Sequence, residues 1–539
     1  MRSAVAKPDP AREYLGRLAD QERALDRRRL ETRSNIGAIG GNGGLAGGKR
    51  DRLTDDWQPG TLAPNQIHRA DGILIRDRAR DLVLNNPLAK GGVDTYIANV
   101  VESGITPKPR FAEAPLRQSW SASWDTWGGL TAHSTREADL TGIQTIYELM
   151  ALWLEEVIVG GGCLIRFVEL PRSSSRRLPL AIELIPEERF ADDRDWPFAG
   201  PRPLNGNPVR RGIEVDALTG RPVAYWIRPY LPNDPNWLMS YQPVRIPAEQ
   251  CEYAYFRKRI GQNRGYTLLH AAILWLWKLG YYTDNELMNS AVRSCFSAMI
   301  TRDQSEDDEA ISDGDPDGPA TDAYGNILEK LQPALIFRGR PGDKIEGVGP
   351  NTPPGDAKTW VNLIERSVGI GMGLSYEELC RDYSQTSFSS CRAGANADRK
   401  RFRPMQQFVV NHFCNPVYRR FVQAAVRAGI DGFPRPSDFL ANIDDWLEVA
   451  WRAPGWASVK PIEDAQAAVV EIDNGLRTRE SYIGERGGDW EETFQQLARE
   501  EKLADDLDLE FPGVGPPKPP PGQTVAGTQE TPLDGAKER

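Results

Sequence analysis

The residues most suggestive of chemistry are the run Gly43-Gly44-Leu45-Ala46-Gly47-Gly48-Lys49, which has the glycine and lysine spacing of a phosphate-binding P-loop. Such a loop needs Ser or Thr next to hold Mg²⁺, and here Arg50 follows. The preceding letters RSNIGAIG are not a buried strand, and the following KRDRLTDDWQPG is a poor helix. We therefore interpret the run as a flexible linker, with a P-loop-like NTPase as the alternative function.

Other catalytic arrangements are poorly supported. Glu155-Glu156 and Asp192-Asp193 are adjacent pairs, which is the wrong spacing for acid–base work, and we expect a solvated edge. The serine clusters lack a G-x-S-x-G elbow. Cys414 and His412 would lie on different helix faces. A nuclease built on carboxylates and Mg²⁺ is a second alternative, but we expect no catalytic residue, no metal site, no cofactor and no enzymatic activity.

Two clusters could contact nucleic acid. Arg399-Lys400-Arg401 with Arg403 lies on a predicted helix and could reach phosphates, although a solvated face or ion pairs between subunits is the favoured interpretation. Trp120, Trp124 and Trp127 could stack on bases, but their spacing favours one packed helix face.

Composition limits the class of protein. The chain has 539 residues, a formal net charge of −10 and 40% hydrophobic residues. No apolar run is long enough to span a membrane, and the N-terminus does not resemble a secretory signal. The six cysteines form no C-x-x-C pair and suggest buried residues in a reducing compartment. The acidic balance argues against a protein that grips nucleic acid over its whole surface, but not against one that surrounds DNA.

The pattern of elements predicts a mixed α+β protein. A basic arm (1–33) is followed by one or two helices over 71–101, broken at Asn85-Asn86-Pro87. Strands are expected at 163–170, 181–185 and 222–227, and an apolar helix at about 266–298. The acidic segment 301–317 reads as an exposed loop, and 333–348 as a two-stranded element around Pro341-Gly342-Asp343. A helix at 355–372, a polar loop at 384–390 and a long helix at 391–428 follow; residues 489–510 are acidic and helical, and the tail from Gly513 is Pro-rich.

Several segments, in the same order, resemble the lambda-type phage portal protein family. The segments are 76–110 (RDRARDLVLNNPLAKGGVDTYIANVVESGITPKPR), 256–273 (FRKRIGQNRGYTLLHAAI), 371–429 and 451–467 (WRAPGWASVKPIEDAQA). The third of these begins with GMGLSYEELCRDYSQTSFSSCRAGANADRKRFRP. The polar loop departs from the Asn-Tyr-Ser-Ser run common in the family, because Phe388-Ser389-Ser390 follows Ser387. No role of that Asn or Tyr is carried over.

The resemblance implies a twelve-fold ring at one capsid vertex, with a channel for genome packaging and ejection. The implied partners are other copies of the chain, double-stranded DNA, the terminase large subunit, the major capsid protein and scaffold, and a head-completion or adaptor protein; a membrane is not among them. The implied location is the virion, with the host cytoplasm during assembly.

The resemblance also implies a division of the chain into an α/β wing, stem helices, an α/β clip and a helical crown. The predicted parts are an arm (1–55), wing (56–265), stem helix (266–300), clip (301–350), second stem helix (351–375), tunnel loop (376–391), long helix and wing return (392–450), crown (451–510) and tail (511–539). The residues implied to face DNA are Ser384, Gln385, Thr386 and Ser387, with possible phosphate contacts from Arg381, Arg399 and Lys400. Those implied to face terminase are Asp307, Asp308, Glu309, Asp343 and Lys344.

Overall fold

The computed structural model describes residues 62–300, 335–338 and 357–509, apart from short gaps at 112, 172–175, 199, 202, 204, 236–241, 385, 457–459 and 508. The chain divides into two units, Met1–Ala63 and Pro64–Arg539. The predicted linker at 37–49, the acidic loop at 301–317 and the Pro-rich tail lie outside the described residues.

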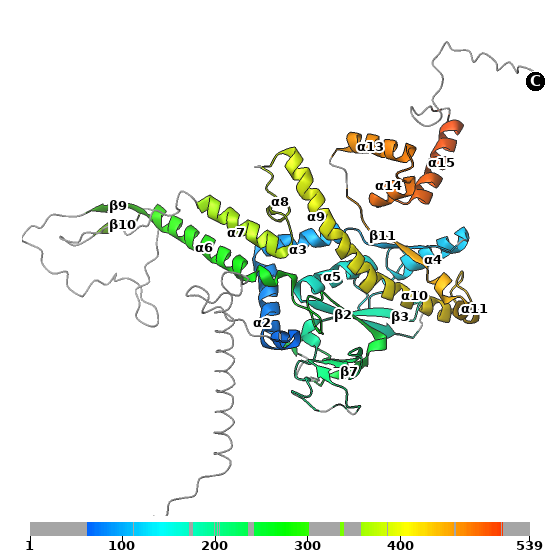
Figure 1. The fold of residues 1–539 in the computed structure, drawn as a ribbon, viewed down its shortest axis with the longest axis horizontal. Helices are drawn as coiled ribbons and strands as arrows, with labels where there is room; N and C mark the ends of the chain where they lie inside the picture. The colour runs from blue at the N-terminus through cyan, green and yellow to red at the C-terminus, as the bar shows by residue number, and fades with distance from the viewer. Residues whose placement is uncertain are drawn as a thin grey trace, which may run out of the picture. The chain divides into compact units, whose positions relative to one another are not determined.

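Four helices begin the described chain (Figure 1): α2 (Pro64–Asn85), α3 (Pro87–Val100), α4 (Ala114–Trp127) and α5 (Ile146–Val159). The break between α2 and α3 is where the sequence predicts it. The Asn86 side chain accepts hydrogen bonds from the backbone N–H groups of Leu88 at 3.0 Å and Ala89 at 3.1 Å. Pro87 follows at the first helical position, where its missing N–H costs nothing.

The strands form small sheets, most of them antiparallel. A three-stranded sheet has the order β3-β2-β8, and a four-stranded sheet the order β4-β5-β6-β7. Their bounds are β2 (Gly162–Glu169), β3 (Leu180–Pro186), β8 (Cys251–Tyr255), β4 (Val209–Arg210), β5 (Ile213–Val215), β6 (Pro222–Ile227) and β7 (Val244–Pro247). A separate pair joins β1 (Thr106–Pro109) to β11 (Val449–Arg452). The three strands expected from the sequence are confirmed as β2, β3 and β6, and the mixed α+β class with them.

The tryptophans of α4 lie in the main core, as their helical spacing predicts. Trp120, Trp124 and Trp127 are each almost completely buried. The Trp120 ring stacks on Phe433, with centroids 4.3 Å apart. The Trp127 indole N–H donates to the carbonyl of Leu180 at 3.0 Å. These rings are therefore packing groups that join α4 to the sheet and to the chain after α10 (Asn415–Ala428), and they are not presented to a ligand.

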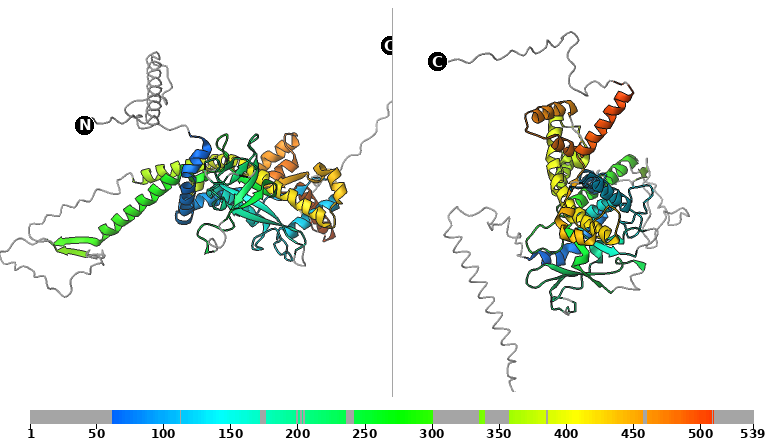
Figure 2. Two further views of the ribbon diagram at one scale, coloured as in Figure 1. Left: turned by 90° about the horizontal axis from the view of Figure 1, so that it is seen from below. Right: turned by 90° about the vertical axis from the view of Figure 1, so that its right-hand side faces the viewer.

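Two helices, α6 (Ile273–Cys295) and α7 (Ala357–Met372), lie side by side, as Figure 2 shows. The sequence predicts α7 closely, but α6 begins later than the expected residue 266. At Gly265 a Cβ would lie 1.8 Å from the carbonyl oxygen of Gly161, so the chain passes too close to its neighbour to coil there. Thr267 then caps a short 3₁₀ turn, η5 (Leu268–Ala271), before α6 starts.

The far end of α6 also differs from the prediction. The residues expected to close the helix form β9 (Phe296–Ile300), which pairs in parallel with β10 (Leu335–Arg338). β10 lies within the predicted two-stranded element and pairs with β9. The second strand expected after Pro341-Gly342-Asp343 falls outside the described residues and stays a prediction. Residues 339–356 lie outside the described part of the chain.

The remaining helices complete the described unit. They are α8 (Tyr376–Cys380), α9 (Phe388–Val409), the π-turn η6 (Val410–Cys414), α10 (Asn415–Ala428), α11 (Pro436–Ala441), α12 (Ile443–Trp446), α13 (Pro461–Asp473), α14 (Arg479–Glu485) and α15 (Trp490–Asp506). The long predicted helix is therefore α9, η6 and α10 in sequence, and it begins at Phe388 rather than 391. The strand β11 crosses the predicted wing–crown boundary. The domain boundaries themselves remain predictions.

Candidate functional site

The loop between α8 and α9 holds most of the predicted DNA-facing residues, and its short turns use their hydroxyl groups. The backbone N–H of Ser384 donates to Asp382 at 3.0 Å, and the Thr386 hydroxyl donates to the carbonyl of Tyr383 at 3.0 Å. The Ser387 hydroxyl oxygen accepts from the backbone N–H of Ser390 at 3.2 Å and caps α9. Gln385 lies outside the described residues. The small polar residues thus define the loop's conformation as well as its surface.

The base of this loop is fastened to the rest of the protein. The Ser375 hydroxyl oxygen accepts from the backbone N–H of Glu378 at 3.2 Å and caps α8, while the Ser375 N–H donates to Asp398 of α9 at 3.2 Å. At the end of α7, the Tyr96 hydroxyl donates to the carbonyl of Met372 at 2.7 Å. Gly373, with φ of 85°, turns the chain between α7 and α8. The segment that leads into the loop is therefore held by hydrogen bonds to α3 and α9.

The predicted phosphate contacts are only partly brought together. Burial raises the pKa of the Glu378 carboxyl, as does the neighbouring Asp398, whereas Arg381 and Arg399 both lower it. The net effect raises the pKa of Glu378, and the charges of both arginines act on this one carboxyl group. Lys400 is exposed on α9, and adjacent helix positions do not share a face. Arg381 and Arg399 thus both influence the Glu378 carboxyl group, whereas Lys400 lies on another face of α9.

One acidic residue at the loop was not among the predicted site residues. Hydrogen bonds from the hydroxyl and the backbone N–H of Ser384 hold the pKa of Asp382 below its usual value, so its carboxylate is charged at neutral pH. The Tyr376 hydroxyl donates to Asp382 at 3.4 Å, and burial raises the pKa of Tyr376 to about 12. The loop therefore begins with Arg381, in a left-handed conformation, followed directly by a carboxylate.

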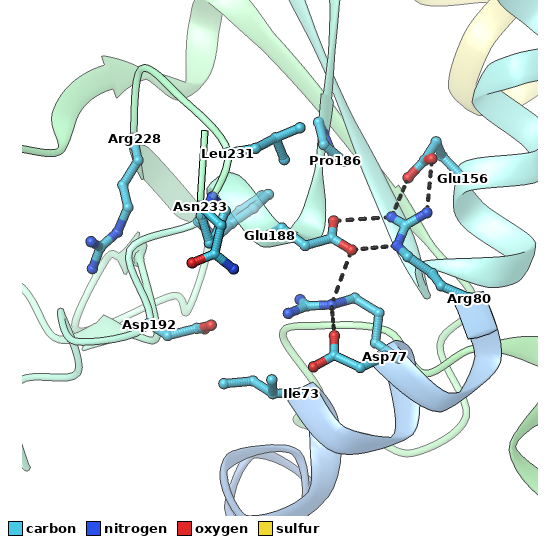
Figure 3. Close-up of a pocket in the computed structure, with 13 residues that line it drawn as sticks. Ile73, Asp77, Arg80, Glu156, Pro186, Glu188, Asp192, Arg228, Leu231 and Asn233 are labelled. Atoms are coloured by element: carbon cyan, nitrogen blue, oxygen red, sulfur yellow. Dashed lines mark hydrogen bonds and ion pairs between the residues drawn. The ribbon is translucent and has the colours of Figure 1, made fainter. Parts of the chain in front are cut away.

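A pocket of about 740 Å³ lies between α2, α5 and the chain after β3 (Figure 3). On one side, the Arg80 guanidinium donates to Glu156 at 2.8 and 3.1 Å and to Glu188 at 3.0 Å. Although burial raises the pKa of Glu188, the hydrogen bond from Arg80 and the charges of Arg76 and Arg80 together hold it below its usual value, so the carboxylate stays charged. The carboxylates here are paired with arginines, which suits a structural junction rather than acid–base catalysis.

This junction corrects the expectation of a solvated edge at both acidic pairs. Glu156 binds Arg80, and Asp192 pairs with Arg211 at 2.9 Å and with Arg264. Their neighbours Glu155 and Asp193 are exposed, as expected. Each pair is therefore split, with one member partly buried in a network of arginines and the other at the surface.

The remaining chemical candidates can be placed within the described part of the chain. There, no group of three or more His, Cys, Asp or Glu is arranged to hold a metal ion. Cys163, Cys251 and Cys414 are buried, as predicted, and burial raises the pKa of all three thiols; Cys380 and Cys391 are only partly buried. Among the described helices, none has the length and apolar character needed to cross a bilayer. The residues implied to face terminase, at 307–309, 343 and 344, lie outside the described ranges.

Comparison with known proteins identifies the family. The family described as "Phage portal protein, lambda family" matches residues 50–406, more than half of the chain, and this match begins just after the P-loop-like run. The chain is 24% identical over 464 residues to the "Probable portal protein" of Halomonas phage phiHAP-1, covering 84% of this chain and 85% of the relative. It is 22% identical over 518 residues to the "Portal protein" of Escherichia phage N15, covering 90% and 92%.

Two further similarities are partial or distant. "Portal protein B" of Escherichia phage lambda is 22% identical over 312 residues, covering 54% of this chain and 58% of the relative. A solved chain from "Neck of native GTA particle computed with C12 symmetry" has 11% identity and a TM-score of 0.34, covering 76% of this chain and 92% of that chain. The assignment rests on the sequence comparisons, above all on the match over residues 50–406: the chain belongs to the lambda family of phage portal proteins.

Proposed function

We propose that this chain is the subunit of a twelve-fold ring at one capsid vertex, whose channel passes the genome during packaging and ejection. The observation that carries the proposal is the family match, which runs from just before α2 into α9 and so includes both helices of the α6–α7 pair and the loop that follows. In this proposal the chain is a structural and DNA-conducting part, not an enzyme. It assembles in the host cytoplasm and remains in the virion.

The α8–α9 loop is proposed as the part that approaches DNA. A channel must let DNA slide, and each additional phosphate contact adds salt-dependent affinity. The described hydroxyls of Ser384, Thr386 and Ser387 are small and engaged in local turns, which suits weak contact. Gln385 extends the same polar run. The charges of Arg381 and Arg399 both act on the Glu378 carboxyl group, which moderates their attraction for phosphates, and Lys400 offers a separate exposed charge.

The proposed partners follow from the ring at the vertex. The acidic segment that contains Asp307, Asp308 and Glu309, with Asp343 and Lys344, would form the clip and dock the terminase large subunit. A head-completion or adaptor protein would replace terminase after packaging. The major capsid protein and scaffold would surround the ring during assembly.

Deletion of residues 301–317 tests the assignment of the clip. The truncated chain should still form rings, since the deletion leaves the described α6–α7 pair and the wing intact. Its binding to terminase, measured by co-sedimentation of purified rings, should fall sharply. Loss of ring formation would contradict the clip assignment, and so would unchanged terminase binding. A matched control replaces the eight acidic residues of this segment by their amides at constant length. This variant separates the effect of removing negative charge from the effect of shortening the chain.

A further inference from the structure

The helix α6 leaves an apolar surface uncovered. Its inward face is buried, with Leu276 and Leu279 almost inaccessible. Large apolar side chains on its other faces are 48–69% exposed: Leu274, Trp275, Trp277, Tyr281, Leu287 and Met288. Four of them, Leu274, Trp277, Tyr281 and Met288, follow a spacing of three, four and seven residues and so form one stripe. The rings of Trp277 and Tyr281 stack within this stripe at 5.9 Å. We call these four residues the α6 stripe.

The helix α7 carries a second, chemically different stripe. Its inward face is formed by Val368, Gly369 and Met372, which are buried. Trp360, Leu363 and Ile370 are 54–77% exposed and lie on the opposite side. We call these three residues the α7 stripe. Contiguous apolar surface of this kind is typical of an interaction site.

The two stripes lie at matching heights along the helix pair. The end of α7 meets the start of α6, because a Cβ on Gly371 would lie 3.5 Å from that of Ala272. The helices lie side by side and run in opposite directions (Figures 1 and 2). Counting about 1.5 Å per residue from this point, Tyr281 and Leu363 are each about 12–14 Å along the pair. Leu274 and Ile370 are level in the same way, both within about 3 Å of the starting point.

We propose that the α6 stripe of one copy packs against the α7 stripe of the next copy, so that this helix pair forms the contact between subunits. The inference rests on the proposed ring and names the surface that builds it. Rotation about a ring axis leaves the position of every atom along that axis unchanged. When the helices run along the axis, two residues at the same height in one chain are therefore also at the same height in neighbouring chains, where they can face each other. Tyr281 then faces Leu363 of the next copy, and Leu274 faces its Ile370.

A second copy fits these stripes better than a self-complementary contact would. One stripe is centred on two stacked aromatic rings and the other on two aliphatic side chains with Trp360, so the two surfaces differ, as a heterologous ring contact requires. The seven side chains of the two stripes would bury on the order of 1,000 Å² at each contact, which reaches the size of a specific interface. Such a contact needs no further protein to cover the helices.

Cysteine cross-linking tests the contact directly. The double variant Tyr281→Cys/Leu363→Cys should give a ladder of covalent oligomers when purified rings are mildly oxidised. A mixture of the two single variants should give dimers at most. The parent chain measures the background from Cys380 and Cys391, and Tyr281→Cys/Leu218→Cys is a matched control, because Leu218 lies at an exposed turn before β6. Leu274→Cys/Ile370→Cys repeats the test at a second height.

The outcomes separate this contact from the ring itself. Ladders for both cysteine pairs, with none for the control, support the contact. Intact rings in which neither pair cross-links would overturn the contact while leaving the proposed function standing. Dimers of Tyr281→Cys alone would overturn it too, because they would indicate a self-complementary contact. Failure of the parent chain to form rings, alone or with its capsid and scaffold proteins, would overturn both.

Discussion

Asp398 on α9 accepts a hydrogen bond from the backbone N–H of Ser375, with 3.2 Å between the two atoms. Asp398 is almost completely buried, and its second carboxylate oxygen has no hydrogen-bond partner within the described structure. Ser375 caps α8, the helix that leads into the polar loop. This bond therefore links the two helices on either side of the loop.

Asp398→Ala should lower the free energy of unfolding by about 1–3 kcal/mol, because the Ser375 N–H is left unpaired in a partly buried position. Asp398→Asn is the matched control. Its amide oxygen can still accept the bond, and it removes a buried charge, so a smaller loss is expected. Chemical denaturation of both variants measures the difference. Equal losses would show that the charge, rather than the hydrogen bond, holds the two helices together.

The Arg264–Glu187 pair is the most deeply buried ion pair described in the structure, with side chains 2% and 1% exposed. The Arg264 Nε donates to Glu187 at 2.7 Å, and the Tyr253 hydroxyl donates to the same carboxylate. Arg264→Met should cost about 3–5 kcal/mol of the unfolding free energy, since it leaves a buried carboxylate unpaired.

Two further variants test whether the loss of stability comes from leaving a buried charge unpaired. Arg264→Met/Glu187→Gln should recover part of the loss, because the unpaired charge is gone. Arg427→Ala removes the exposed pair with Glu169, at 2.8 Å, and should cost at most about 1 kcal/mol. If the two arginine variants lose equal stability by denaturant titration, burial is not what makes the Arg264 pair important.

His68 should make stability fall in mild acid. Its pKa lies well below the usual value because of burial and then of Arg264, Arg211 and Arg76; the Arg211 Nη1 is 3.4 Å from its Nδ1. The unfolded chain binds a proton on this residue below about pH 6.5, whereas the folded chain does not until lower pH. The free energy of unfolding should therefore fall by up to about 1.4 kcal/mol per pH unit below about pH 6.5 from this residue alone.

Replacement of His68 isolates this contribution to acid sensitivity. His68→Gln cannot titrate, so its unfolding free energy should depend less on pH between 6.5 and 5.5 than that of the parent chain. The comparison uses the slope with pH and not the absolute stability, so a uniform loss from altered packing does not affect it. Parallel curves for the two chains would show that His68 takes up its proton equally in the folded and unfolded states.

Local signals in the sequence were sufficient to predict much of the fold. The break at Asn86 and Pro87, the strand at 162–169 and the buried face of α4 each depend on a few neighbouring residues. The late start of α6 was not predictable in this way, since it depends on contact between Gly265 and Gly161. The parallel pairing of β9 with β10 likewise joins segments separated by a long stretch of chain.

The same limit applies to the candidate site. The polar loop was identified from its residue types, but its link to Asp398 was not, because Ser375 and Asp398 are 23 positions apart. Glu156 was expected to be solvated because its partner Arg80 is 76 residues away. A pair of carboxylates carries no local signal of the arginine that a distant helix will bring to it.

Positive charge on the loop should slow the movement of DNA if the loop faces the channel. Ser384→Lys/Gln385→Lys adds two ammonium groups that attract phosphates, and the slowing should weaken as salt concentration rises. The rate of packaging into capsids built with each variant measures the effect. Leu218→Lys places a charge at the exposed turn before β6 and should leave the rate unchanged. An unaltered rate in the loop variant would place the loop away from the DNA.

The most direct test of the central claim is the mass of the purified protein in solution, by native mass spectrometry with electron-microscope images of the same sample. A portal subunit predicts a species near twelve times 60.1 kDa that appears as a ring with a central hole. The measurement is repeated with capsid and scaffold proteins present, since these can template assembly. A chain that stays monomeric or dimeric under both conditions would contradict the proposed ring.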